Sequence, residues 1–191
     1  MIEIIKSNSG IDNLTHYLSI FSNCHERGIR QGSDSGLSIG GGLVFKYSNL
    51  YLGFDLRSLS NDVDDKIDLY VGYKLNLFDG IQFEYRKSEE TISKNKTDEF
   101  SIKMDFQQNY SNKFIYNIDT KNYYNILSAK MSIITDLELK YGYTNEPSKP
   151  NYIELSAERG LGNFYVTSTI GKQLNQNKDD YQTFDISYAK V

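Results

Sequence analysis

The side chains that most often perform chemistry are scarce in this sequence. Its 191 residues include two histidines and a single cysteine. A Ser-His-acid arrangement could pair His25 with Ser33 or Ser35, but such a triad is recognised by its geometry, which one segment of sequence does not supply. The lone Cys24 forms no intrachain disulfide and provides no cysteine metal site. We therefore expect no catalytic residues and no enzymatic activity.

Metal, phosphate and nucleic-acid sites are also not expected. The run Asp62, Asp64 and Asp65 is acidic, but a hydrated loop explains it better than a calcium site does. The triplet at residues 40–42 is glycine-rich, yet no helix follows it, so it is not a phosphate-binding loop. The 21 basic and 25 acidic residues give a net charge of -4 and form no basic block, which argues against nucleic acid as a partner. No cofactor is expected.

The elements that must position any site are β-strands. Hydrophobic residues alternate with polar residues or glycine along most of the chain, as at residues 67–75, and helical periodicity is absent. Mean hydropathy is -0.53, and no stretch approaches the roughly 18 consecutive apolar residues of a membrane-spanning helix. The alternation predicts about twelve strands, in residues 14–24, 37–47, 50–57, 67–76, 81–86, 100–106, 114–119, 127–133, 136–143, 153–158, 164–170 and 184–188.

The predicted connections alternate in length. Short turns are expected at residues 47–49, 78–80, 110–112 and 160–163, with a short link near Thr135. Long loops are expected at His25–Gly36, Ser58–Asp65, Lys87–Glu99, Asn145–Asn151 and Gln173–Asp180, with a short link near Lys121 as the exception. Short turns at one rim and long loops at the other are typical of outer-membrane β-barrels.

Alternation alone is compatible with two opposite structures. A soluble sandwich or lipid-binding barrel turns its apolar face inward, whereas a membrane barrel turns it toward lipid. Glycines are depleted in ordinary hydrated strands but make room where large side chains crowd a lumen. Four lie on the polar face in mid-strand: Gly40, Gly42, Gly53 and Gly72. This favours the membrane barrel.

Aromatic residues of the apolar face gather near predicted strand ends, as in the two interfacial girdles of membrane barrels. Phe45, Tyr47, Phe106, Phe114 and Phe164 lie toward short turns, and Tyr85, Phe100 and Tyr143 toward long loops. We therefore predict an all-β fold: a transmembrane antiparallel up-and-down β-barrel of about twelve strands. Residues 1–13 are expected to form an extension outside the barrel and residues 14–191 the barrel itself. Residues 1–13 lack the apolar run of a secretory signal, so we expect that signal to have been removed or to be encoded upstream.

The charged side chains of the polar face are the candidate site. Burying each of them in a dry core would cost several kcal/mol before pairing, so this face is wet or densely paired, for example by Asp55 with Lys46 or Lys74. The predicted lumen-lining residues are Lys46, Asp55, Arg57, Asp68, Lys74, Glu84, Arg86, Lys103, Asp105, Lys130, Glu138, Lys140, Glu154, Glu158 and Asp185.

Several segments resemble a known family. The run Glu26-Arg27-Gly28-Ile29-Arg30-Gln31, residues 37–57, residues 67–73 and the closing stretch 152–188 are similar to segments of TorF-type porins. The sequence departs from that pattern at Glu26, where an aromatic residue is usual, and at Arg30, where serine is expected. The resemblance implies a protein of the bacterial outer membrane, in contact with membrane lipid, and it brings no catalytic residues.

Three functional hypotheses follow. Eight strands give a filled interior and roughly 16–18 leave an aqueous channel, so twelve predict a narrow or partly occluded lumen. The leading hypothesis is a porin that passes small polar solutes with little charge selectivity, because both signs of charge are present. The second is a closed barrel that binds a partner through the Lys87–Glu99 loop. The third is a soluble barrel that holds an apolar ligand. The oligomeric state is not predicted.

Overall fold

The computed structural model describes residues 13–22, 25–26, 29–30, 37–58, 65–77, 79–107, 109–132, 135–147, 149–174 and 181–190; at 13, 21, 25, 26, 29, 30, 37 and 190 it describes the backbone alone. Cys24, Ser33, Ser35, Asp62 and Asp64 lie outside the described residues, as does most of the predicted N-terminal extension. The division of the chain at residue 13 stays a prediction. Within the described residues, no helix is long and apolar enough to span a membrane.

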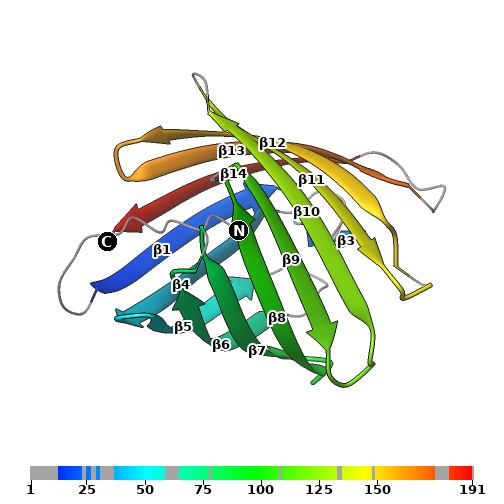
Figure 1. Cartoon of the computed structure of the whole chain (residues 1–191). Helices are drawn as coiled ribbons and strands as arrows, with labels where there is room; N and C mark the ends of the chain where they lie inside the picture. Colours follow the sequence, from blue (N-terminus) through cyan, green and yellow to red (C-terminus); the bar gives the residue numbers. More distant parts are fainter. Residues whose placement is uncertain are drawn as a thin grey trace.

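Twelve strands form one closed antiparallel barrel (Figure 1), and two two-residue strands, β2(His25–Glu26) and β3(Ile29–Arg30), pair in a separate small sheet. The strands are β1(Asn13–Ser22), β4(Leu37–Tyr47), β5(Leu50–Ser58), β6(Lys66–Leu75), β7(Ile81–Glu90), β8(Lys96–Phe106), β9(Tyr110–Asn117), β10(Tyr123–Ser132), β11(Asp136–Thr144), β12(Tyr152–Leu161), β13(Phe164–Gln173) and β14(Tyr181–Lys190). The predicted fold class, a closed all-β barrel of about twelve strands, is confirmed.

The first and last strands close the barrel. Each strand from β4 to β14 pairs with its neighbours in sequence, and β1 pairs with β4 on one side and with β14 on the other. The β1–β14 seam runs from His16 opposite Lys190 to Ser22 opposite Phe184. At its end the backbone N–H of Phe184 donates to Ser22 Oγ at 3.1 Å. The topology is therefore up-and-down, with no unpaired edge in the barrel.

The connections differ between the two rims, as the sequence predicts. The turns β4–β5 and β12–β13 contain residues 48–49 and 162–163, whereas residues 59–65 separate β5 from β6 and residues 145–151 separate β11 from β12. The turn predicted at residues 110–112 is displaced. β9 already begins at Tyr110, and Gln107, directly after β8, has a positive φ of 51°.

The long loop predicted at Lys87–Glu99 is wrong. β7 continues to Glu90 and β8 starts at Lys96, with Arg86 opposite Glu99 in the ladder between them. Both faces of this stretch carry polar side chains, so alternation does not reveal the strand although its backbone hydrogen bonds continue. Such a hairpin extends beyond the apolar band of the barrel.

The apolar face of the barrel points outward. Leu52, Leu69 and Leu139 are each about half exposed, whereas the alternating residues of the same strands are more buried. Among the described residues, the buried set is mainly polar, with Asp55, Asp68 and several serines against a few hydrophobic side chains such as Ile115. The third hypothesis, in which the apolar face turns inward around an apolar ligand, is therefore wrong. The interior of this barrel is its polar face.

Candidate functional site

Tyrosine rings lying on glycines form much of the inner wall. Tyr70 on β6 is the register partner of Gly53 on β5, and Tyr51 on β5 is the partner of Gly72 on β6. A Cβ added to Gly53 would come within 1.9 Å of the Tyr70 ring, and one added to Gly72 within 2.0 Å of the Tyr51 ring. The arrangement recurs around the barrel, in the register pairs Tyr17–Gly42, Tyr152–Gly142, Tyr165–Gly160 and Tyr181–Gly171.

These contacts explain the glycines on the polar face. The expectation that glycine makes room for large side chains holds at Gly42, Gly53 and Gly72, where a methyl group would overlap a tyrosine ring. Sequence reasoning missed the glycines of β11 to β13 and the tyrosines that cover them. A glycine directly opposite an inward-facing tyrosine on the neighbouring strand would have identified them. That alignment can be recognised only when the register between the two strands is known.

The hydroxyls of these tyrosines hold carboxylates in place. Tyr70 donates to Asp55 Oδ1 at 3.2 Å, and Tyr51 donates to Glu84 Oε2 at 3.0 Å. The Tyr51 and Tyr70 rings meet edge to face with centroids 6.2 Å apart. Each ring thus fills the space above a glycine at one end and orients an acidic side chain at the other.

Four buried charged residues form the Arg86 cluster, defined as Asp55, Asp68, Glu84 and Arg86. Arg86 Nη1 lies 3.0 Å from Asp68 Oδ2 and 3.8 Å from Asp55 Oδ2, and Nη2 lies 3.2 Å from Glu84 Oε1. The guanidinium also stacks on Tyr70, with Cζ 4.5 Å from the ring centroid. All four residues are less than one-tenth exposed. One guanidinium with its planar donors therefore joins carboxylates from three strands.

The remaining predicted lumen residues share this inward face, because they alternate with the exposed apolar side chains. Lys103 Nζ lies 3.4 Å from Asp105 Oδ1 on β8, and Lys140 Nζ lies 2.9 Å from Glu138 Oε2 on β11. Lys130 Nζ, more exposed at the end of β10, lies 3.8 Å from Glu138 Oε1. The sequence analysis suggested Lys46 or Lys74 as the cation that pairs with Asp55. It did not predict Arg86, which lies beside Asp55 in the structure. The same face also carries Lys46, Arg57, Lys74, Glu154, Glu158 and Asp185.

Strands β12 to β14 carry a second group of carboxylates, here called the acidic strip: Glu154, Glu158 and Asp185. Glu154 accepts a 2.5 Å hydrogen bond from the Tyr181 hydroxyl. Glu158 accepts one of 3.3 Å from Thr167 Oγ1. The two glutamates are thus held by neutral hydroxyl donors, in contrast to the guanidinium that joins the Arg86 cluster.

One loop of the long rim folds back over the inner wall. Lys149, between β11 and β12, lies 5.5 Å from the centroid of the Tyr124 ring, and its Nζ lies 3.1 Å from Glu146 Oε2. Burial lowers the pKa of Lys149, but Tyr124 and Glu146 raise it by more, so its pKa lies above the ordinary value. The ring of Tyr124 is 2 % exposed. This contact fastens the described residues between β11 and β12, 145–147 and 149–151, to the mouth of the barrel.

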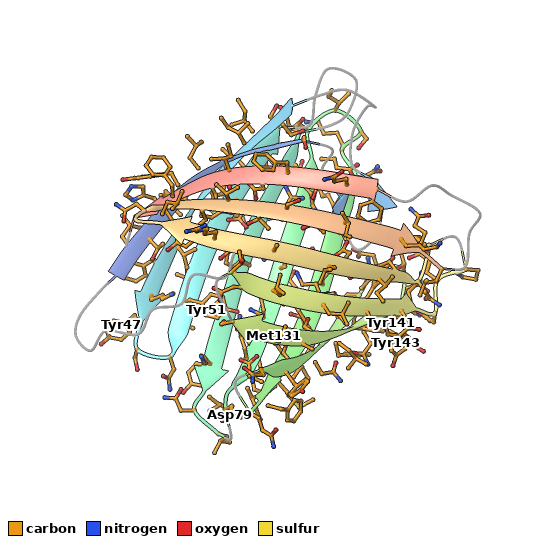
Figure 2. All side chains as sticks on the ribbon, turned by 90° about the horizontal axis from the view of Figure 1, so that it is seen from above. Tyr47, Tyr51, Asp79, Met131, Tyr141 and Tyr143 are labelled. Atoms are coloured by element: carbon orange, nitrogen blue, oxygen red, sulfur yellow. The ribbon has the colours of Figure 1, made fainter. Side chains whose placement is uncertain are left out.

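Aromatic side chains lie at both ends of the outer face, as the sequence predicts. Figure 2 shows Tyr47 at one end of the barrel and Tyr141 and Tyr143 at the other. Tyr47 is 64 % exposed next to a short turn, and the Tyr141 and Tyr143 rings lie 6.1 Å apart near a long-rim loop. Amphipathic rings in these positions suit the boundary between hydrocarbon and water.

The described residues contain no group of three or more His, Cys, Asp or Glu side chains placed to hold a metal ion. His16 lies on the outward face of β1 among exposed apolar residues, and the side chain of His25 is outside the described part. The chemistry available at the inner wall is therefore that of fixed charges and hydrogen-bonding groups facing a lumen.

Two solved structures resemble this barrel over almost its whole length. A structure described as "KdgM porin" has a TM-score of 0.65 and 8% sequence identity, covering 94% of this chain and 99% of the other. A second, "KdgM porin in complex with disordered oligogalacturonate", also has a TM-score of 0.65 and 8% identity, with 93% and 98% covered. No protein-family model matches the sequence, and no curated protein matches it. At this identity the likeness is one of fold.

Proposed function

We propose that this protein is a porin of the bacterial outer membrane, which gives small polar solutes passive passage through a narrow charged lumen. One observation carries the proposal: in a closed barrel, the outward face is apolar and the inward face bears fixed charges. A soluble barrel would need the opposite arrangement, because exposing an apolar face of this size to water is energetically unfavourable. The protein acts on no substrate chemically.

The structural neighbours support the same function. Both are porins by description, and their folds agree with this one over nearly the full length of each chain. The resemblance of residues 26–31 and 152–188 to TorF-type porins leads to the same class, and membership of that family is part of the proposal. The lumen-lining residues predicted in the sequence analysis, of which Lys46 is the first and Asp185 the last, are proposed as the wall along which solutes pass.

The solute of one neighbour does not transfer directly. That porin is described in complex with oligogalacturonate, a chain of sugars that each carry a carboxylate. A lumen for such a polyanion needs cations that are not already neutralised, whereas Arg86 here is surrounded by Asp55, Asp68 and Glu84. We therefore propose small polar solutes as the substrate class and do not extend the proposal to this polyanion.

Single-channel recording tests this function directly. The protein is refolded in detergent micelles and checked by its mobility before and after boiling on a denaturing gel. It is then added to a planar lipid bilayer in potassium chloride. We expect discrete conductance steps, small because twelve strands leave a narrower lumen than the roughly 16–18 of general porins. A boiled sample in the same micelles is the control. Folded protein that inserts without conductance would overturn the proposal.

The alternative of a closed barrel with a binding loop has less support. It depended on a long loop at Lys87–Glu99, and most of that segment is strand, with Glu90 N–H donating to the Asn95 carbonyl at 2.9 Å to close a tight turn.

A further inference from the structure

The charges of the inner wall are not evenly distributed. The inward-facing positions of β12, β13 and β14 carry the acidic strip, Glu154, Glu158 and Asp185. Every other described residue at an inward-facing position of these three strands is neutral. On β5 to β8, by contrast, carboxylates lie beside Arg86 and Lys103. The lumen is therefore polarised, with one wall acidic and the other mixed.

Register places two of these carboxylates in one row. Glu158 on β12 is opposite Thr167 on β13, and Thr167 is opposite Asp185 on β14. Neighbouring strands lie about 4.8 Å apart, so the two acidic residues are about 10 Å apart at the backbone with one threonine between them. A small cation in front of Thr167 would be within reach of both carboxylates.

Buried oxygens next to this row have no hydrogen-bond partner. They are Asp185 Oδ1 and the Oγ of Ser187, which follows two residues later on the same face of β14. Ser187 is 4 % exposed. Arg57 is the described side chain whose positive charge acts on Asp185. Buried polar atoms are normally satisfied, so this corner offers oxygen acceptors that a passing ligand can use.

The hydrogen bonds of the acidic strip do not neutralise it. Tyr181 and Thr167 are neutral donors. Lys140 on β11 is opposite Glu154 in the register, but its Nζ lies 2.9 Å from Glu138 Oε2. The charges of Glu154 and Glu158 therefore remain as sources of potential. A wall lined with one sign of charge, within a low-dielectric shell, raises the local concentration of the opposite ion. The presence of both signs of charge, 21 basic and 25 acidic residues, suggests little selectivity, but the positions of the charges create a preferred path for cations.

We propose that the acidic strip is a cation subsite of the lumen and makes the pore select small cations over anions. This inference rests on the proposed pore function, and it narrows the class of transported solutes to small cations. The subsite is centred on the row of Glu158 and Asp185 with the unpaired oxygen of Ser187 beside it, and Glu154 extends the acidic strip four residues along β12.

The reversal potential of the full chain in a potassium chloride gradient measures this preference. We expect a potassium-to-chloride permeability ratio on the order of 10, because one-signed clefts enrich counter-ions by at least that factor. The triple change Glu154→Gln, Glu158→Gln and Asp185→Asn should bring the ratio close to unity, and Asp185→Asn alone should lower it part of the way. The matched control is Glu89→Gln, which removes an acid paired with Lys96 outside the lumen and should leave the ratio unchanged.

A second measurement does not depend on conductance. Terbium ions bound near tyrosine emit when the ring is excited, and Tyr181 donates its hydroxyl to Glu154. Terbium added to the folded protein in micelles should give this emission in the wild type and in Glu89→Gln, but not in the triple variant. Loss of mutual repulsion among the acids should keep the triple variant folded, and the boiled and unboiled gel samples check this.

The outcomes separate the two proposals. A pore that conducts but passes chloride as readily as potassium overturns the cation subsite and leaves the porin standing. A folded protein without conductance overturns the porin, and terbium emission then decides on the subsite. Emission that survives in the triple variant overturns the subsite whatever the conductance. The subsite is supported if the triple variant loses both cation selectivity and terbium emission while Glu89→Gln keeps both.

Discussion

The ring of Tyr70 lies directly on Gly53, so that a Cβ at Gly53 would be 1.9 Å from the nearest ring carbon. The ring cannot simply turn aside, because its hydroxyl donates to Asp55 and Arg86 stacks on its face. Glycine at this position is therefore required by a contact across strands, while its own backbone conformation is one that other residues adopt.

The first prediction concerns this contact. Gly53→Ala should lower the free energy of unfolding by about 2 kcal/mol, within the usual range for overpacking. Gly160→Ala is the control, since its added Cβ would lie 3.3 Å from Tyr165 and needs only a small adjustment; its effect should be within about 0.5 kcal/mol. Urea unfolding in lipid vesicles measures both. In a Tyr70→Ala background, Gly53→Ala should become nearly neutral, and additive effects would contradict the contact.

The second prediction concerns the Arg86 cluster. Arg86→Met should destabilise the barrel by about 3 kcal/mol, because it leaves the carboxylates of Asp55, Asp68 and Glu84 buried without their shared cation. Lys96→Met removes a partner of Glu89 from an exposed pair and should cost less than about 1 kcal/mol. Equal effects of the two changes would show that the cluster is hydrated like a surface pair. The same vesicle unfolding experiment compares them.

The third prediction tests the direction of the apolar face. Leu155, near the middle of β12, is opposite Leu139 on the outer surface. Leu155→Arg should destabilise the protein in vesicles by about 2–4 kcal/mol, the cost of a cation at the bilayer midplane. Ile92→Arg, in the turn between β7 and β8, should cost about 0–1 kcal/mol. If Leu155→Arg instead promoted a stable fold in plain buffer, the outer surface would not face lipid.

The fourth prediction concerns the loop fastened by Lys149. Lys149→Met should release residues 145–151 from Tyr124 and increase their cleavage by added protease, whereas Lys94→Met in the β7–β8 turn should not. Because the pKa of Lys149 is raised, its charged contact should be fully present below the ordinary lysine pKa of 10.5 and be lost as pH rises through the higher folded value. Cleavage should therefore be constant from mildly acidic to mildly alkaline pH. An increase within that window would contradict the assignment.

Much of the fold follows from the sequence because a strand with one wet and one apolar face repeats every two residues. That period identified the barrel, its rims and the residues of its polar face. It failed at residues 87–99, since a strand with two polar faces has no such period. Pairing in the site was also not predictable: Arg86 joins Asp68 and Asp55 on the next two strands, which depends on register and on the reach of a long side chain. The fold of residues 145–151 over Tyr124 depends on one lysine and leaves no periodic signal.

The seam between β1 and β14 has a consequence for how the molecule is made. Its first strand, Asn13–Ser22, finds its second partner only when Tyr181–Lys190 has been synthesised. Until then the sheet has two open edges, which are templates for aggregation. We therefore expect the barrel to close only after the chain has been synthesised through Lys190. A protein truncated before β14 should fail as a whole, rather than survive as a slightly smaller barrel.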